Sequence, residues 1–154
     1  MQKNITASPP KEIIERLIQL ESNGQHAALA EATGKVLEHY PYCPVVWNLL
    51  GVAKGHEGQF SDAIKAFEEA LKFKPDFVDA LNNLGTTYRS ADNRSATKIA
   101  YERALSLRPR SYVTLTNLGT LFVDSGEPDQ AIDTFNKALE INPAYSVALY
   151  NLGN

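Results

Sequence analysis

The sequence predicts an all-α protein built from stacked pairs of helices. The main observation is a repeat of 34 residues that runs through most of the chain. Within each repeat, large apolar residues return on one helical face, as in the segments 45–57 and 60–73. Glycine and proline mark the boundaries between these segments. Units of this length cannot bury an apolar face alone, so the pattern favours a solenoid in which neighbouring units cover one another.

Six columns of the repeat keep the same 34-residue period without a gap. Three hold large apolar or aromatic residues, two hold glycine or alanine, and one holds proline. Their members are Trp47, Leu81, Leu115 and Leu149; Leu50, Leu84, Leu118 and Leu152; Gly51, Gly85, Gly119 and Gly153; Phe67, Tyr101 and Phe135; Ala70, Ala104 and Ala138; and Pro75, Pro109 and Pro143. The columns define repeats at 44–77, 78–111 and 112–145.

Each repeat is expected to contain two helices joined by a tight turn. Gly58, Asp92 and Gly126 share one column at this turn, where a residue that tolerates left-handed geometry is needed. Asn93 or Ser95 is expected to cap the second helix of the repeat 78–111. The proline column lies past the ends of the second helices and prevents them from continuing.

The glycine column falls in the middle of the first helix, where glycine costs up to ~1 kcal/mol relative to alanine. A cost that recurs in register at Gly51, Gly85 and Gly119 needs a reason. We expect a close approach of the paired helix, which any side chain at these positions would push away.

The two ends of the chain depart from the pattern. Residues 1–9 form an N-terminal tail, and 10–43 form a divergent first repeat in which Arg16 and Leu17 replace the leucine–glycine pair. Residues 146–154 match the first helix of a fifth, incomplete repeat. Val147, Leu149 and Leu152 are expected to occupy buried columns there, with no second helix to cover them. We expect the chain to be the N-terminal part of a larger protein, or its open end to be covered by another copy.

Composition argues against several classes of function. The 154 residues carry a net charge of -3, which does not favour a nucleic-acid partner. No apolar run approaches the ~20 residues that a membrane span needs. The single cysteine, Cys43, excludes an intrachain disulfide, and the N-terminus lacks the features of a secretory signal, so a cytoplasmic location is expected. The histidines His26, His39 and His56 lack metal-ligand spacing and are expected at the surface or in turns, and no catalytic arrangement is found; we expect no metal, no cofactor and no enzymatic activity.

The pattern W-x-x-L-G, followed by small and aromatic residues and then proline, resembles the tetratricopeptide-repeat (TPR) family from Pro10 to Asn154. Lys54 stands where that pattern has tyrosine. The resemblance implies a right-handed superhelical solenoid of antiparallel helix pairs. It also implies that the first helix of each pair lines a concave groove that receives a peptide segment of a partner protein.

Three asparagines recur in a further column, Asn83, Asn117 and Asn151, with Leu49 in the repeat 44–77. At ~100° per residue, this column points about 150° away from the buried face of the first helix. It therefore predicts an exposed ladder of amides, which can both donate to and accept from a peptide backbone. The ladder is similar to that in the repeat domain of O-linked N-acetylglucosamine transferase. Simple duplication of the repeat is the alternative explanation.

Further residues are expected to face the groove because they lie on the same side of the first helices. They are Asn48, Asn82, Thr86, Arg89, Thr116, Thr120, Asp124, Tyr150 and Asn154. Some members of the family clamp acidic C-termini with lysines and an arginine in the groove. The corresponding positions here hold Asn48, Asn82, Thr116, Asn83 and Asn117, so a receptor for such tails is not expected. The sequence therefore favours a non-catalytic scaffold that binds a protein or an extended peptide. The alternative is a self-association module that forms homo-oligomers through the groove and the uncapped C-terminal end.

Overall fold

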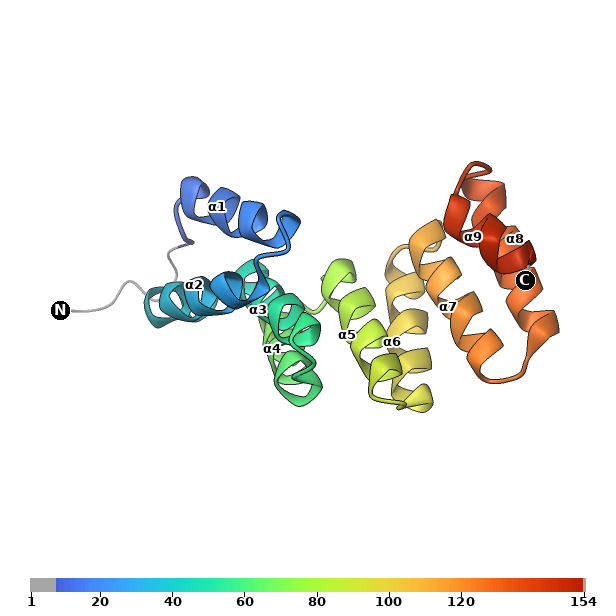
Figure 1. Ribbon diagram of the computed structural model, residues 1–154, viewed down its shortest axis with the longest axis horizontal. Helices are drawn as coiled ribbons and strands as arrows, with labels where there is room; N and C mark the ends of the chain where they lie inside the picture. Colours follow the sequence, from blue (N-terminus) through green and yellow to red (C-terminus); the bar gives the residue numbers. More distant parts are fainter. Residues whose placement is uncertain (1–7, 154) are drawn as a thin grey trace.

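The computed structural model describes residues 8–153, and this part of the chain is all helical. The helices follow one another as antiparallel neighbours along one long array (Figure 1). In chain order they are α1 (Lys11–Ser22), α2 (His26–His39), α3 (Pro44–His56), α4 (Phe60–Phe73), α5 (Val78–Ser90), α6 (Arg94–Leu107), α7 (Tyr112–Asp124), α8 (Pro128–Ile141) and α9 (Ser146–Gly153). The odd-numbered helices are the first helices of the predicted pairs, and α3, α5 and α7 each pack against the helix before and the helix after.

Each of the four described turns between paired helices contains one residue with positive φ. Gly58 and Gly126 have φ of 75° and 72°, and Asp92 has φ of 55°. Gly24, which the sequence column did not include, has φ of 68° and lies 34 residues before Gly58. The turn between α1 and α2 is therefore built like the later ones. Asn93 caps α6 as expected, because its Oδ1 accepts a hydrogen bond from the backbone N–H of Ala96 at 3.1 Å.

Glycine and an aromatic ring meet inside each of the three later helix pairs. A Cβ atom added to Gly51 would lie 2.5 Å from the ring of Phe67, and the same holds for Gly85 with Tyr101 and for Gly119 with Phe135. Real Cβ atoms do not approach other atoms so closely, so a side chain at the glycine column would separate the helices. All three rings are 1% exposed. The close helix approach predicted for this column is confirmed.

The first helix pair fills the same position differently. Leu17 stands in the glycine column and Thr33 stands in the aromatic column, and both are buried. In this pair the larger residue lies on the first helix and the smaller one on the second, which is the reverse of the later pairs. The backbones of α1 and α2 come close over a smaller area than those of the later pairs, as expected when leucine replaces glycine at the crossing.

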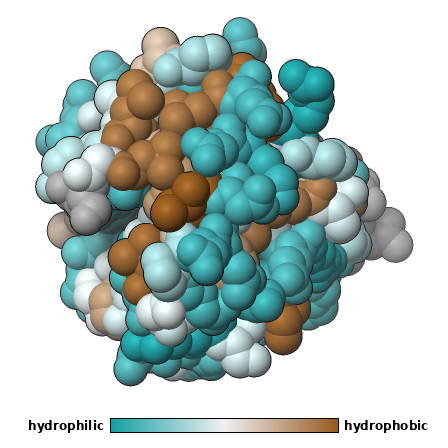
Figure 2. Space-filling view, turned by 90° about the vertical axis from the view of Figure 1, so that its right-hand side faces the viewer, coloured by the Kyte–Doolittle hydropathy of each residue, from teal (hydrophilic) through white to brown (hydrophobic). Residues whose placement is uncertain are grey.

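The C-terminal helix α9 leaves apolar side chains uncovered. Leu149 is 50% exposed, whereas its column mates Leu81 and Leu115 are 1% and 8% exposed. Figure 2 views this end of the array and shows apolar side chains gathered on it. Val147 is also exposed, but the expectation that its column is buried was wrong, since Val113 in the same column is 40% exposed. Within residues 8–153, no helix has the length and apolar character to cross a membrane.

Candidate functional site

The candidate site lies on one side of α3, α5, α7 and α9, which we call the leading-helix face. It comprises the predicted groove residues together with the asparagine column. Asn83, Asn117 and Asn151 come from three successive odd-numbered helices and are all partly buried. The column was predicted to be exposed, and its three side chains are only partly exposed. Asn83 and Asn151 each form a hydrogen bond with the preceding odd-numbered helix, which accounts for part of their burial.

Asn83 uses its amide to join α5 to α3. Its Nδ2 donates a hydrogen bond to Asn48 Oδ1 at 3.1 Å. Asn48 is only 9% exposed, so its expected position in the open groove was wrong. Among the described residues, Asn83 Oδ1 accepts no hydrogen bond. One carbonyl oxygen and one N–H of Asn83 are therefore available at the partly exposed edge of its amide.

A second contact between odd-numbered helices has the same sequence spacing. Arg89 on α5 forms an ion pair with Asp124 on α7, with 3.2 Å between Nη1 and Oδ2. This pair and the Asn48–Asn83 pair are both 35 residues apart. At these two junctions, α3 with α5 and α5 with α7, the polar contacts thus follow a register of i to i+35. The same register relates Asn82 to Asn117, but Asn82 Oδ1 is buried without a hydrogen-bond partner among the described residues.

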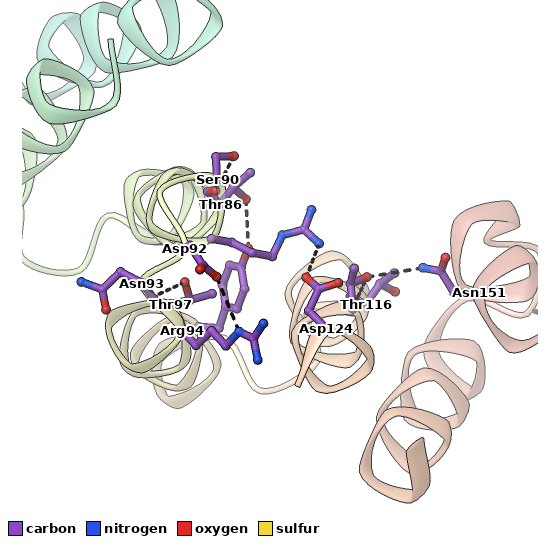
Figure 3. A network of polar contacts seen from close by, with 12 residues as sticks. Thr86, Ser90, Asp92, Asn93, Arg94, Thr97, Thr116, Asp124 and Asn151 are labelled. Atoms are coloured by element: carbon purple, nitrogen blue, oxygen red, sulfur yellow. Dashed lines mark hydrogen bonds and ion pairs between the residues drawn. The ribbon is translucent and has the colours of Figure 1, made fainter. Parts of the chain in front are cut away.

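Asn151 connects α9 to α7 through hydroxyl groups. Its Nδ2 donates to Thr120 Oγ1 at 3.4 Å, and that hydroxyl donates in turn to the backbone carbonyl of Thr116 at 3.0 Å (Figure 3). Thr116 is 2% exposed, and its own hydroxyl bonds to the carbonyl of Tyr112. Thr116 was expected to face the groove, but its side chain is buried and its hydroxyl is used within α7.

Tyr101 places a phenol beneath the leading-helix face. Its hydroxyl lies 3.0 Å from Thr86 Oγ1, and Ser90 donates to the backbone carbonyl of Thr86, one turn earlier in α5 (Figure 3). Burial raises the pKa of the Tyr101 phenol above its ordinary value, and the Thr86 hydrogen bond opposes this only in part. The phenol therefore remains neutral at physiological pH and anchors Thr86.

A cavity of about 230 Å³ lies among α3, α4 and α5 on this side of the array. It reaches the surface beside the exposed residues Thr86 and Ser90. Each of the three helices contributes to the wall. Its lining includes Gly55, His56, Phe60, Phe67, Asn83 and Ser90. No column of the repeat predicts this cavity, because its shape depends on how α3, α4 and α5 meet.

The remaining candidates are spread along the face. Thr86 and Asp124 are exposed, Arg89 is partly buried, and Tyr150 is 70% exposed. Asn154 lies outside the described residues. The structure thus brings Asn83 and Thr86 together at the cavity, and it brings Asn151 and Thr120 together farther along the array.

Two of the histidines contact each other, which the sequence did not predict. The rings of His26 on α2 and His56 on α3 stack with centroids 3.9 Å apart and an interplanar angle of 5°. His26 is partly buried, and its Nδ1 has no hydrogen-bond partner, so it is not a simple surface residue. Stacked parallel rings do not direct their nitrogens toward a shared ion. Among residues 8–153, no group of three or more potential ligands gathers to hold a metal.

Comparison with known families identifies the repeat. Models described as TPR repeat and Tetratricopeptide repeat match residues 56–90, 78–111 and 112–145. Together these matches span residues 56–145, more than half of the chain. The chain belongs to the tetratricopeptide-repeat family. Its all-helical architecture is that of a TPR solenoid, and TPR repeats are typical of proteins that bind other proteins.

One curated relative is human Tetratricopeptide repeat protein 13. The two are 44% identical over 46 residues, which is 30% of this chain and only 5% of that protein. The chain therefore corresponds to a small part of this relative's length. The match supports the assignment to the family only.

Several solved structures have a similar shape, and one of them is described as a TPR protein. MamA aligns with a TM-score of 0.78 and 22% identity over 94% of this chain and 81% of its own. TTC0263, a TPR protein of Thermus thermophilus, aligns with a TM-score of 0.85 and 16% identity over 95% of this chain and 81% of its own. A chain of the APC/C hetero-tetramer Cut9–Hcn1 aligns with a TM-score of 0.85 and 22% identity over 92% of this chain and 29% of its own. At these identities the likeness concerns the fold.

Proposed function

We propose that this protein is a non-catalytic scaffold that binds an extended peptide segment of a partner protein on its leading-helix face. The observation that carries the proposal is the column of Asn83, Asn117 and Asn151, which places three partly exposed amides on successive helices of one face. An amide can donate and accept together, which suits a peptide backbone regardless of its side chains.

The spacing of the column fits an extended ligand. Neighbouring packed helices lie ~8–10 Å apart, and an extended chain rises ~3.3 Å per residue. One asparagine could therefore address roughly every third residue of the peptide. Hydroxyl groups at Thr86 and Thr120 lie one turn further along the same helices and add hydrogen-bonding capacity.

The near-neutral character of the face determines the expected selectivity. Its one ion pair between helices, Arg89 with Asp124, neutralises both charges within the protein. We therefore expect binding that depends on backbone and polar contacts and only weakly on salt concentration.

The test is an array of random peptides probed with the wild type and with the Asn83→Ala plus Asn117→Ala variant. Loss of two amides should weaken binding about tenfold or more. Asn136→Ala is the matched control, because Asn136 is an exposed asparagine on α8, outside the leading-helix face. Thermal unfolding confirms that each variant is folded. Unchanged binding by the double variant would eliminate the asparagine column, and no binding by the wild type would overturn the proposal.

A second candidate function is self-association through the C-terminal end. It is supported by Leu149, which is 50% exposed, whereas Leu81 and Leu115 in the same column are buried. In sedimentation equilibrium, the mass of the wild type should rise with concentration, and Leu149→Asp should remain monomeric. Ile99→Asp is the control, since Ile99 is a similarly exposed apolar residue on α6. A wild type that is monomeric at every concentration contradicts this candidate.

A further inference from the structure

The junction between α3 and α5 differs from the next junction at one pair of positions. In the i to i+35 register, Arg89 on α5 meets Asp124 on α7, and their side chains span the space between the helices. The corresponding pair on α3 and α5 is Gly55 and Ser90. Neither has a side chain long enough to span the gap. The cavity lies at this junction, and both residues line it.

Glycine at position 55 is not required by the backbone or by the helix packing. Its φ is not in the left-handed region, and an added Cβ would lie 3.8 Å from Thr87 Oγ1 and 3.9 Å from Ala63 Cβ, which are ordinary van der Waals distances. Gly51, in contrast, would place its Cβ 2.5 Å from the Phe67 ring. Glycine is also a poorer helix former than alanine. The one remaining consequence of a glycine at position 55 is that it leaves open space between the helices.

The lining of this space selects the chemistry of its occupant. Its walls include Val52 and the rings of Phe60 and Phe67, and no aspartate, glutamate, lysine or arginine side chain lines it. The one ionisable side chain in the lining is His56, whose ring is stacked on that of His26. A cation placed there would have no carboxylate to pair with, and most of the lining is apolar, so the cavity suits an uncharged, apolar group. At about 230 Å³ it is smaller than the ~300–1,000 Å³ of typical small-molecule sites. It has room for one side chain.

We propose that this cavity receives a single apolar side chain of the bound peptide, with Asn83 at its edge holding the adjacent peptide group. The inference rests on the proposed function and deepens it, because it names the chemical class of the ligand: an extended peptide with one apolar anchor residue. Since the Arg89–Asp124 pair bridges the next junction, we expect no equivalent anchor position there. That position fixes the register of the peptide on the asparagine column.

The experiment uses a phage-displayed library of random decapeptides selected on the full chain. Wild-type selections should converge on sequences with one position restricted to apolar residues. Gly55→Leu fills the cavity and should weaken the selected peptide at least about tenfold, as measured by fluorescence anisotropy. Gly34→Leu is the matched control, because Gly34 is an exposed glycine on α2 with no atom near its added Cβ. It should leave the affinity unchanged.

Two further variants keep the inference testable if Gly55→Leu folds poorly. Gly55→Ala fits without a close contact and should shift the selected anchor toward smaller residues. Arg89→Gly combined with Asp124→Ser copies the Gly55 and Ser90 pair at the next junction. Selections on this double variant should acquire a second apolar position.

The outcomes separate the two proposals. If peptides bind and neither Gly55 variant changes affinity or anchor preference, the cavity is not the anchor site, although peptide binding stands. If the wild type selects no peptide, both the inference and the proposed function are overturned.

Discussion

The first helix pair and the three later complete pairs place large and small residues on opposite helices. In α3/α4, α5/α6 and α7/α8, a glycine on the first helix lies against an aromatic ring from the second. In α1/α2, Leu17 occupies the first helix and Thr33 the second, and both are buried. Interiors are close-packed, so the combined volume at a helix crossing is constrained more tightly than either residue alone. The comparison teaches that a divergent repeat can keep its fold while losing the motif that identifies it.

Removing the aromatic ring should produce the largest effect. Phe67→Ala should lower the free energy of unfolding by ~3–5 kcal/mol, because it deletes a fully buried ring and leaves a cavity. Thr33→Ala in the first pair should cost only ~1 kcal/mol, since it removes a small side chain whose hydroxyl bonds to the Leu29 carbonyl at 2.7 Å. Urea unfolding followed by circular dichroism measures both. Equal losses would mean that the two pairs depend on this position to the same degree.

Enlarging the glycine should have the next largest effect. Gly85→Leu should lower the free energy of unfolding by ~1–3 kcal/mol or more, because its side chain would collide with the Tyr101 ring. Gly34→Leu provides the matched comparison on an exposed helix face and should be neutral or stabilising by up to ~1 kcal/mol. The same urea titration measures both variants. A neutral Gly85→Leu would show that the helices can separate without cost.

Copying the first pair into the second should recover part of the loss. Gly51→Leu combined with Phe67→Thr reproduces the arrangement of Leu17 and Thr33. A double-mutant cycle should give a favourable coupling of ~1–3 kcal/mol, because each change makes room for the other. Recovery should be incomplete, since the α3 and α4 backbones lie closer than those of α1 and α2. If the two losses of stability simply add, the side chains at these two positions do not compensate for each other in volume.

Replacing Tyr101 by phenylalanine should have the smallest effect at neutral pH. Tyr101→Phe introduces the residue found at Phe67 and Phe135 in the same column. It removes the hydrogen bond to Thr86, which should lower the free energy of unfolding by ~0.5–1.5 kcal/mol.

The same variant should also alter the response to alkaline pH. Burial raises the folded-state pKa of Tyr101, so the unfolded chain loses this proton first as the pH rises past ~10. The contribution of Tyr101 is therefore complete below pH ~10 and is lost as the pH rises through the folded-state pKa. Urea unfolding between pH 7 and 11 should show a steeper alkaline loss of stability for the wild type than for Tyr101→Phe. Tyr88, whose pKa burial also raises, contributes equally to both proteins.

The fold was largely predictable because each of its requirements is local or repeats with the period of the sequence. The glycine column, the turn column and the cap at Asn93 each reflect one backbone or packing constraint, and each appears in the structure at the expected place. Gly24 could have been found by extending the turn column one repeat backward. The candidate site was predictable only as a face. Asn48 and Thr116 lie on that face of their helices, yet the next odd-numbered helix covers them.

The sequence by itself determined the helix pairs, their turns and the side of each first helix that faces away from its partner, because all of these follow a period of 34 residues. Only the tertiary structure decided how adjacent odd-numbered helices are offset, since the polar contacts that join α3 to α5 and α5 to α7 connect residues 35 apart. That offset of one residue pairs Asn83 with Asn48 and Arg89 with Asp124, and it leaves Gly55 opposite Ser90. The cavity lies where Gly55 and Ser90 face each other, and these residues belong to different columns of the repeat. An alignment of the repeats therefore does not reveal it.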